Sequence, residues 1–391
     1  MRYSWFVNAP MVTGRGSLEH LAQIGARRVA LVADTRALAA TGALQRAGDL
    51  LTRTGCDWTL VHDVRQEPRM RDVQEAVPAM RAYAPDAILA MGGGSALDVA
   101  KALWFFYEVP DATWDMAFAA FALPRLGVRA RLIAVPTTSG TGSETTCVAV
   151  LVDEGGRKRL MMSRELIPSL AILDPDLVDS MPSQVASSSG MDALTHAIEA
   201  AVCTIASPMV TAVAVEAAAG IMEWLTASVA AAPGSPERRQ AREMVHYAAS
   251  RAGMAINNSS AGLAHAMDQI GPLLGIPHGL ACSLALPYTV AFTGLQPAFS
   301  ILARRLGGSG DDAGLSRHLV GRIWKLGRDL GLPAGLRECG VSERQFAPLA
   351  EALSREAAGS GSARLAPAAP DEDGFARMFW QVFRGAPPLA G

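Results

Sequence analysis

One carboxylate and three imidazoles in this chain have the residue types and spacing needed to bind a single divalent metal ion. Asp192 and His196 are four residues apart in a helix-compatible run, which places both side chains on one face of a helix. His265 and His278 follow later, and the chain between them is long enough to return to the same ion. Imidazole with carboxylate suits Fe(II), Zn(II) or Mn(II) better than calcium or magnesium. Together the four residues predict a metal centre, although each histidine alone would more often be a packed core residue.

Two glycine-rich turns lie upstream, each after a hydrophobic run typical of a buried parallel strand. The first covers residues 92–98 and the second covers residues 136–144. Glycines let the backbone approach a pyrophosphate, and the N–H groups that open the next helix stabilise its charge. Ser95 and Asp98 also have the spacing of a capping box, so the first turn can equally be a well-capped helix start. Neither turn matches a dinucleotide fingerprint or a Walker A loop, and each alone is a weak signal.

A third element bears on nucleotide binding. Residues 28–33 predict a strand that ends at Asp34, where a carboxylate can accept hydrogen bonds from ribose hydroxyls. Its negative charge would favour NAD over NADP, because it repels a 2′-phosphate. The alternative is that Asp34 only caps a helix predicted over residues 37–45.

Chain length and the order of the patterns predict two domains. A chain of 391 residues exceeds one ordinary domain. Strands first alternate with helices such as residues 70–83, which is the pattern of parallel βαβ units in a Rossmann-like domain. Later helical patterns cover residues 183–203, 208–231, 235–254, 294–305 and 315–330. We therefore expect an α/β nucleotide-binding domain over residues 1–180, an all-α metal-binding domain over residues 181–391, and catalysis between them.

Composition excludes several kinds of partner. Half of the residues are hydrophobic and the net charge is −2, with no basic run to attract nucleic acid or an anionic membrane. The apolar stretch over residues 205–232 contains Glu216 and Glu223, which predicts a buried helix rather than a membrane span. The first ten residues lack the apolar core of a secretory signal, and the five cysteines are scattered. We expect a soluble, cytoplasmic protein with reduced thiols.

Taken in order, these motifs resemble those of the metal-dependent, iron-containing alcohol dehydrogenases, from the first strand to about residue 292. The resemblance rests on residues 92–95, 136–144, 190–199 and 277–279 together. It implies a dehydroquinate synthase-like architecture and an NAD(H)-linked alcohol dehydrogenase or aldehyde reductase, with a homodimer as the default assembly. Fe(II) or Zn(II) would polarise the oxygen of a primary alcohol or short aldehyde while hydride moves to or from nicotinamide.

Carried over position by position, the resemblance gives the predicted site residues a role each. The metal ligands would be Asp192, His196, His265 and His278. The dinucleotide would contact Gly93, Gly94 and Ser95 at the pyrophosphate, Asp34 and Lys158 at the ribose, and Thr137, Thr138 and Ser143 at the nicotinamide side. Asp98 is a further predicted cofactor-binding residue.

One departure from the family pattern affects the expected mechanism. Many members carry a further histidine four residues after the third ligand, and this chain has Gln269 there. Glutamine cannot relay a proton by titrating, so that task would fall to water, a ribose hydroxyl or another residue. Ser259 and Ser260 are more polar than the apolar pair expected of ethanol-type enzymes, which leaves a polar or anionic substrate open.

Two alternatives come from other classes of protein. A lyase similar to dehydroquinate synthase would use metal and NAD without net oxidation, but it needs several Lys and Arg around an acidic carbocycle, and the segments flanking these ligands are apolar. A metallohydrolase or a non-catalytic metal-binding protein would make the glycine turns merely structural. Binding of NAD discriminates against this second alternative.

Overall fold

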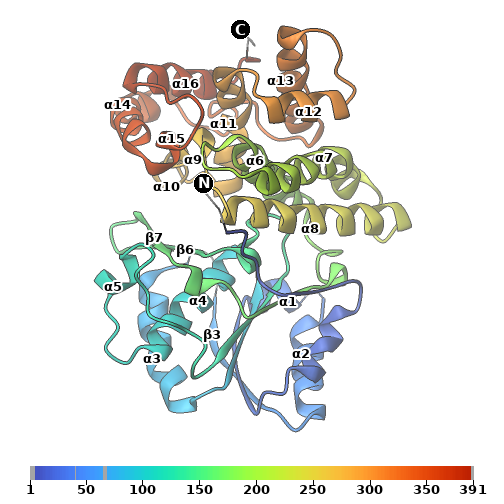
Figure 1. Ribbon diagram of the computed structural model, residues 1–391, viewed down its shortest axis with the longest axis vertical. Coiled ribbons are helices and arrows are strands. Elements are labelled where there is room, and N and C mark those ends of the chain that lie inside the picture. Colours follow the sequence, from blue (N-terminus) through green and yellow to red (C-terminus); the bar gives the residue numbers. More distant parts are fainter. Residues whose placement is uncertain (1–4, 40, 65–67, 389–391) are drawn as a thin grey trace. The chain divides into compact units, whose positions relative to one another are not determined.

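The computed structural model describes residues 5–39, 41–64 and 68–388, and within them the chain forms two compact units. Asn8–Met181 is an α/β unit, and residues 182–388 together with residues 5–7 are an all-helical unit (Figure 1). This confirms the predicted fold class. Residues 5–7 belong to the helical unit, whereas the prediction placed them with the α/β domain.

The α/β unit is built on a six-stranded parallel sheet. In spatial order its strands are β1 (Met11–Thr13), β8 (Leu170–Leu173), β5 (Arg131–Pro136), β4 (Ala87–Gly92), β2 (Arg28–Ala33) and β3 (Asp57–Asp63). The chain passes from β2 to β3 at the edge and then returns to β4 on the other side of β2. Because the direction of connection reverses there, the carboxyl ends of β2 and β4 form a topological switch point, the usual ligand site of such sheets.

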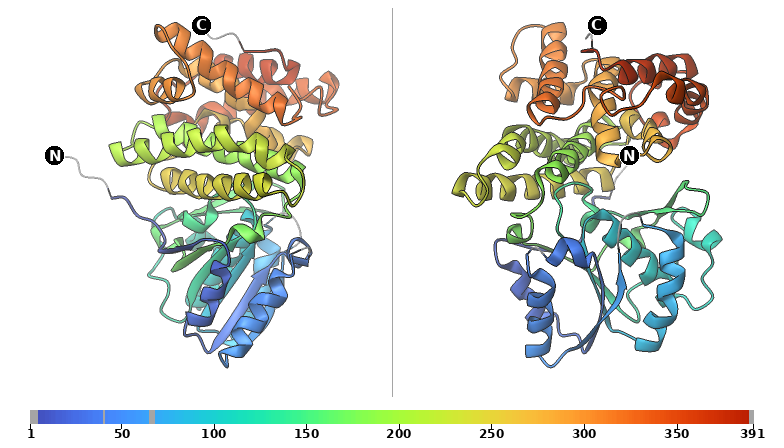
Figure 2. Two further views of the ribbon diagram at one scale, coloured as in Figure 1. Left: turned by 90° about the vertical axis from the view of Figure 1, so that its right-hand side faces the viewer. Right: turned by 180° about the vertical axis from the view of Figure 1, so that it is seen from behind.

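Helices cover both faces of this sheet (Figure 2). They are α1 (Thr35–Ala39), α2 (Ala43–Arg53), α3 (Met70–Tyr83), α4 (Gly94–Glu108) and α5 (Trp114–Phe118), and β6 (Val148–Val152) pairs antiparallel with β7 (Lys158–Met162) beside them. In β2, Val29 and Leu31 pack in the cluster that contains α2, while Ala30 and Val32 pack in the cluster that contains α3 and α4. Successive residues therefore face two different cores, which explains the continuous apolar run.

The single helix predicted over residues 37–45 is wrong. The segment contains two helices, because α1 ends at Ala39 and α2 begins at Ala43. Gly42 between them has a φ of 62°, a left-handed conformation that glycine adopts without strain and that interrupts a helix.

The helical unit contains two hydrophobic clusters that share one helix. Its helices are α6 (Ser183–Val202), α7 (Pro208–Ala230), α8 (Pro236–Asn257), α9 (Leu263–Ala266), α10 (Ile270–Leu274), α11 (His278–Thr293), α12 (Pro297–Arg305), α13 (Asp312–Asp329), α14 (Glu343–Gly359), α15 (Gly361–Arg364) and α16 (Glu372–Arg384). Leu286 and Val290 of α11 pack with α6, α7, α8, α12 and α13, whereas Leu284 and Tyr288 pack with α9, α10 and α14 to α16. Leu280 in the first turn of α11 packs against both clusters, so this turn is fixed between two cores.

One described helix, α7, is long and apolar enough by length and composition to cross a membrane. Half of its most apolar window is buried, and it packs against α6, α8 and α12. This packing agrees with the buried bundle helix predicted for the same stretch.

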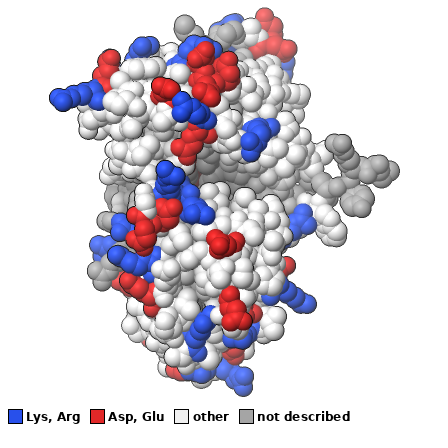
Figure 3. Space-filling model, turned by 90° about the vertical axis from the view of Figure 1, so that its left-hand side faces the viewer, with Lys and Arg blue, Asp and Glu red and all other residues white. Residues whose placement is uncertain are grey.

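On the face drawn in Figure 3, the described basic and acidic side chains are intermingled.

Candidate metal centre and nucleotide site

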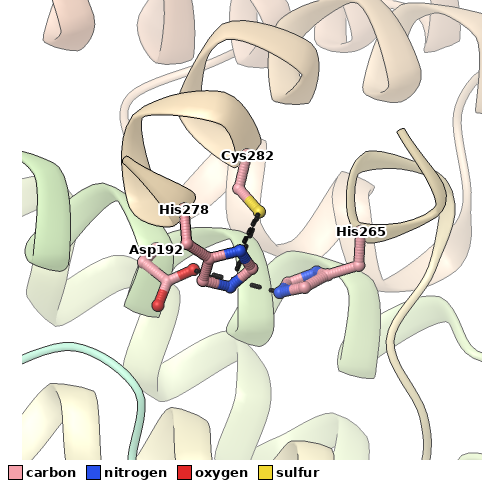
Figure 4. A group of neighbouring side chains, drawn as sticks. All are labelled: Asp192, His265, His278 and Cys282. Atoms are coloured by element: carbon pink, nitrogen blue, oxygen red, sulfur yellow. Dashed lines mark hydrogen bonds and ion pairs between the residues drawn. The ribbon is translucent and has the colours of Figure 1, made fainter. Parts of the chain in front are cut away.

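Three helices bring predicted metal ligands to one place in the helical unit. Asp192 projects from the middle of α6, His265 lies in the short helix α9, and His278 is the first residue of α11. Together with Cys282 of α11 they form a group whose potential ligand atoms all lie within 4.8 Å of one another (Figure 4). Asp192 Oδ1 is 3.4 Å from His278 Nε2 and 3.9 Å from His265 Nε2. These separations are close to those of donors around one ion.

The fourth predicted ligand, His196, lies beside this group rather than within it. Its ring stacks on that of His265, with 4.7 Å between the centroids and 15° between the planes. His196 Nδ1 and His265 Nε2 are buried and have no hydrogen-bond partner among the described residues. Leaving buried polar atoms unsatisfied is costly, and a cation at the edges of these rings would accept the lone pairs of such nitrogens. The donor set therefore fits a divalent metal ion of the kind that imidazole and carboxylate bind.

The charges around the rings are those of a cation site. Burial lowers the pKa of His278, but Cys282, Asp192 and a hydrogen bond to Asp268 outweigh burial and raise the pKa to about 10. The negative groups that stabilise a proton on this ring would equally stabilise a metal ion in its place. Burial also lowers the pKa of His196, to about 4, so this ring is neutral near pH 7, as a metal ligand must be.

Cys282 is the one member of the group that sequence reasoning did not place there. Its sulfur is fully buried and lies 3.8 Å from His278 Nδ1 and 3.9 Å from His278 Nε2. Nearly equal distances to both nitrogens place the sulfur away from the lone-pair axis of Nε2. The sulfur is therefore not placed to share a metal ion with Nε2. Cys282 therefore packs against the ring of His278, and its spacing of four residues from His278 in one helix could have indicated this contact.

Gly279 allows the first turn of α11 to touch α6. A Cβ added at Gly279 would lie 2.5 Å from the backbone oxygen of Ser188 and 3.2 Å from the Cβ of Asp192. A backbone atom cannot move aside as a flexible side chain can, so any larger residue must push the two helices apart. This close approach holds His278 beside Asp192.

Gly279→Ala should therefore weaken metal binding. We expect the zinc Kd to rise about tenfold, because overpacking of about 1–3 kcal/mol separates α11 from α6. Competition with a fluorescent zinc chelator measures this Kd. Gly321→Ala in α13 is the matched control, since a Cβ there meets nothing within 4 Å. Equal affinities in the two variants would show that the contact does not position His278.

At the switch point of the α/β unit, the two glycine-rich turns pack directly on each other. A Cβ added at Gly93 would lie 3.2 Å from Thr138 Cγ2, and one added at Gly94 would lie 2.6 Å from Thr141 Cγ2. Thr137 N–H donates to the carbonyl oxygen of Gly92 at 2.9 Å, so the second turn is also tied to the end of β4. The buried Thr137 Oγ1 has no hydrogen-bond partner among the described residues, which leaves a hydroxyl available to a ligand.

The capping box predicted for Ser95 and Asp98 is wrong. Helix α4 starts after Gly93, and that N-cap position has no side-chain hydrogen bond. The Asp98 carboxylate instead accepts hydrogen bonds from Ser143 Oγ at 2.7 Å and from the N–H of Val150 at 3.0 Å. Asp98 and Ser143 therefore fasten the second turn and β6 to α4.

Asp34 lies beside the first glycine turn. Its N–H donates to the carbonyl oxygen of Met91, and a Cβ on Gly92 would lie 3.5 Å from the Asp34 Cβ. Asp34 Oδ1 also accepts from the N–H of Ala37 at 3.0 Å, so the residue does cap a helix, the short helix α1. Capping occupies one oxygen, and the residue still stands at the switch point, where a ribose would lie.

The two remaining predicted residues occupy less defined positions. Lys158 opens β7 and pairs with Val152 across the small antiparallel sheet. Gln269 is half-buried and precedes α10, without a side-chain hydrogen bond to the helix end. Neither placement assigns these side chains a contact in the metal cluster.

Comparison with known proteins covers both units. Residues 9–175 match the family described as iron-containing alcohol dehydrogenase, and residues 186–370 match the C-terminal part of the same family. An NADPH-dependent butanol dehydrogenase from Clostridium saccharobutylicum is 33% identical over 378 residues, which are 95% of this chain and 96% of that protein.

Solved structures agree with these matches. An iron-containing alcohol dehydrogenase from Thermococcus thioreducens has a TM-score of 0.89 and 32% identity, covering 98% of this chain and 100% of that one. A sulfoacetaldehyde reductase from Bifidobacterium kashiwanohense, solved with NAD+, has a TM-score of 0.85 and 27% identity, covering 98% and 99%.

The fold and these matches define a metal-dependent oxidoreductase that acts on alcohols with a nicotinamide cofactor. The chain belongs to the iron-containing alcohol dehydrogenase family.

Proposed function

We propose that this protein transfers hydride between NAD(H) and a primary alcohol or short aldehyde at a metal ion held by Asp192, His196, His265 and His278. The observation that carries the proposal is the convergence of three of these ligands from three helices, with the fourth ring stacked beside them. The buried nitrogens of His196 and His265, which lack partners among the described residues, support it. Iron is the native metal that we propose, although the donor set accommodates Fe(II) and Zn(II) alike.

A bound divalent ion supplies Lewis acidity at the substrate oxygen, and nicotinamide supplies or accepts the hydride. The chain's own residues position these groups. Gly93, Gly94 and Ser95 would hold the pyrophosphate at the start of α4, and Thr137 and Thr138 would line the nicotinamide side. By the same family resemblance Lys158 would reach the ribose, while Asp98 and Ser143 would act by fixing the second turn.

Gln269 would orient the substrate or its water without titrating. A proton from the alcohol would then leave through water or a ribose hydroxyl.

We further propose a cytoplasmic homodimer. No disulfide joins the cysteines among the described residues, which is consistent with a reducing compartment, and the mass in solution tests the assembly.

The deciding experiment follows NADH oxidation by absorbance with short aldehydes, both neutral and anionic. Protein reconstituted separately with Fe(II) and with Zn(II) is compared with chelated protein. We expect turnover only with metal, and the panel ranks the substrates. Turnover that is unchanged after complete metal removal would contradict the proposal. Absence of turnover despite metal and NADH binding would favour either a substrate outside the panel or the lyase alternative.

Asp34 tests the proposed preference for NAD. In Asp34→Asn, the ratio of kcat/KM for NADPH to that for NADH should rise about tenfold, because the carboxylate no longer repels the 2′-phosphate. The asparagine can still cap α1, so this variant separates charge from capping. Asp34→Gly should shift the ratio in the same direction and also lose the bond to Ala37. An unchanged ratio in both variants would make Asp34 a helix cap only.

A further inference from the structure

Two carboxylates outside the proposed ligand set hold the rings of two proposed ligands. His265 Nδ1 lies 2.5 Å from Glu199 Oε2, and His278 Nδ1 lies 2.9 Å from Asp268 Oδ2. Both carboxylate residues are buried, with exposed fractions of 7% for Glu199 and 8% for Asp268. In each pair the other ring nitrogen, Nε2, is the one near Asp192.

This arrangement fixes which nitrogen is available to a metal. With a proton on Nδ1 donated to the carboxylate, the lone pair on Nε2 points toward the ion, and the negative partner makes that nitrogen a stronger donor. Such partners set both the tautomer and the orientation of a ligand ring.

The two pairs differ in what else holds the ring. The side chain of His265 is 11% exposed, and Glu199 also accepts the N–H groups of Gly262 and Ala264, so the segment before His265 is tied down as well. The side chain of His278 is 37% exposed and sits at the first residue of its helix. Cys282 also packs against the ring of His278, but this ring is the less enclosed of the two, so we expect it to depend more on its carboxylate partner.

We propose that Asp268 is a positioning residue of the metal centre: it locks the His278 ring with Nε2 toward the ion and thereby retains the metal. This inference rests on the proposed function, because it requires a metal at this cluster. Asp268 is three residues after His265 and directly before Gln269. Asp268, in the segment that follows His265, would thus help to hold the metal by fixing the ring of His278.

Metal affinity tests the inference without measuring turnover. Zinc is titrated into chelated protein against a fluorescent chelator, and its release to excess EDTA is timed. In Asp268→Asn the Kd for zinc should rise about tenfold and release should become faster by a similar factor; in Asp268→Ala the Kd should rise about 100-fold. Asp311→Asn, which changes an N-cap carboxylate of α13 in the same unit, should leave both quantities at the wild-type value.

Two further measurements distinguish a positioning role of Asp268 from a role in folding. The thermal midpoint of the chelated protein and the Kd for NADH should be the same in Asp268→Asn as in the wild type. The inference would be overturned if both Asp268 variants bound zinc as tightly as the wild type. It would also be overturned if the chelated Asp268→Asn protein had a lower thermal midpoint, because a structural role would then explain the loss of zinc affinity. Failure of the wild-type protein to bind zinc or Fe(II) would instead overturn the proposed function.

Discussion

His265→Ala is expected to lower kcat/KM for the best aldehyde by about 1,000-fold or more while leaving the Kd for NADH nearly unchanged. A Lewis-acid metal contributes several kcal/mol to such a reaction, and each 1.4 kcal/mol is about tenfold in rate. His265 Nε2 is one of the donors in the cluster, so its removal leaves the ion poorly held. The nucleotide turns belong to the other unit, which explains the separation of the two effects.

The fold should survive this substitution. Glu199 loses its partner ring but keeps hydrogen bonds from the N–H groups of Gly262 and Ala264. Steady-state kinetics with measured metal content is the readout, and NADH binding is followed by fluorescence. His318→Ala is the matched control, because that ring lies in α13 beside the carbonyl oxygen of Leu306. Comparable activity in the two variants would exclude His265 as a ligand.

Gly94→Val should raise the Kd for NADH about 100-fold. A Cβ at Gly94 would lie 2.6 Å from Thr141 Cγ2 and 2.8 Å from Thr141 Oγ1, so even the first carbon of the new side chain collides with the second turn. Overpacking of this kind costs about 1–3 kcal/mol, and its upper end is about 100-fold in affinity. Pushing the turns apart also moves the N–H groups that start α4 away from the pyrophosphate position.

Two companion variants show whether the collision is the cause. Thr141→Ala combined with Gly94→Val removes both colliding atoms and should recover most of the affinity. Gly93→Ala is a milder test, because its Cβ would lie 3.2 Å from Thr138 Cγ2 and its backbone is extended. Zinc binding should be normal in all of them. A Gly94→Val protein that binds NADH normally would show that this turn does not cradle the cofactor.

Elements with one strong periodic pattern were predictable from sequence. The strand over residues 28–33 and the helix over residues 70–83 have the predicted bounds, because a short apolar run rich in valine is typical of a buried strand and a longer amphipathic run is typical of a helix. The helix over residues 37–45 failed because Gly42 interrupts an otherwise helical composition. A single glycine is tolerated inside many helices, so composition alone does not reveal the break.

The proposed ligands could be named from spacing and family resemblance, but the groups around them could not. Glu199 and Asp268 are joined to His265 and His278 by tertiary contacts, and periodicity carries no information about which buried carboxylate faces which ring. Asp98 shows the same limit, since its capping-box spacing suggested a local role and its partners are Ser143 and Val150 instead.

Residues 5–7 belong to the helical unit, and this affects the order in which the two units fold during synthesis. Asn258 binds both backbone groups of Val7, accepting from its N–H at 2.7 Å and donating to its carbonyl oxygen at 2.9 Å, and Asn257 donates to the same oxygen. The α/β unit is continuous in the chain, so it can fold as soon as Met181 has left the ribosome. Val7 must wait until α8 has been translated before its partners exist. We therefore expect the helical unit to be completed after the α/β unit.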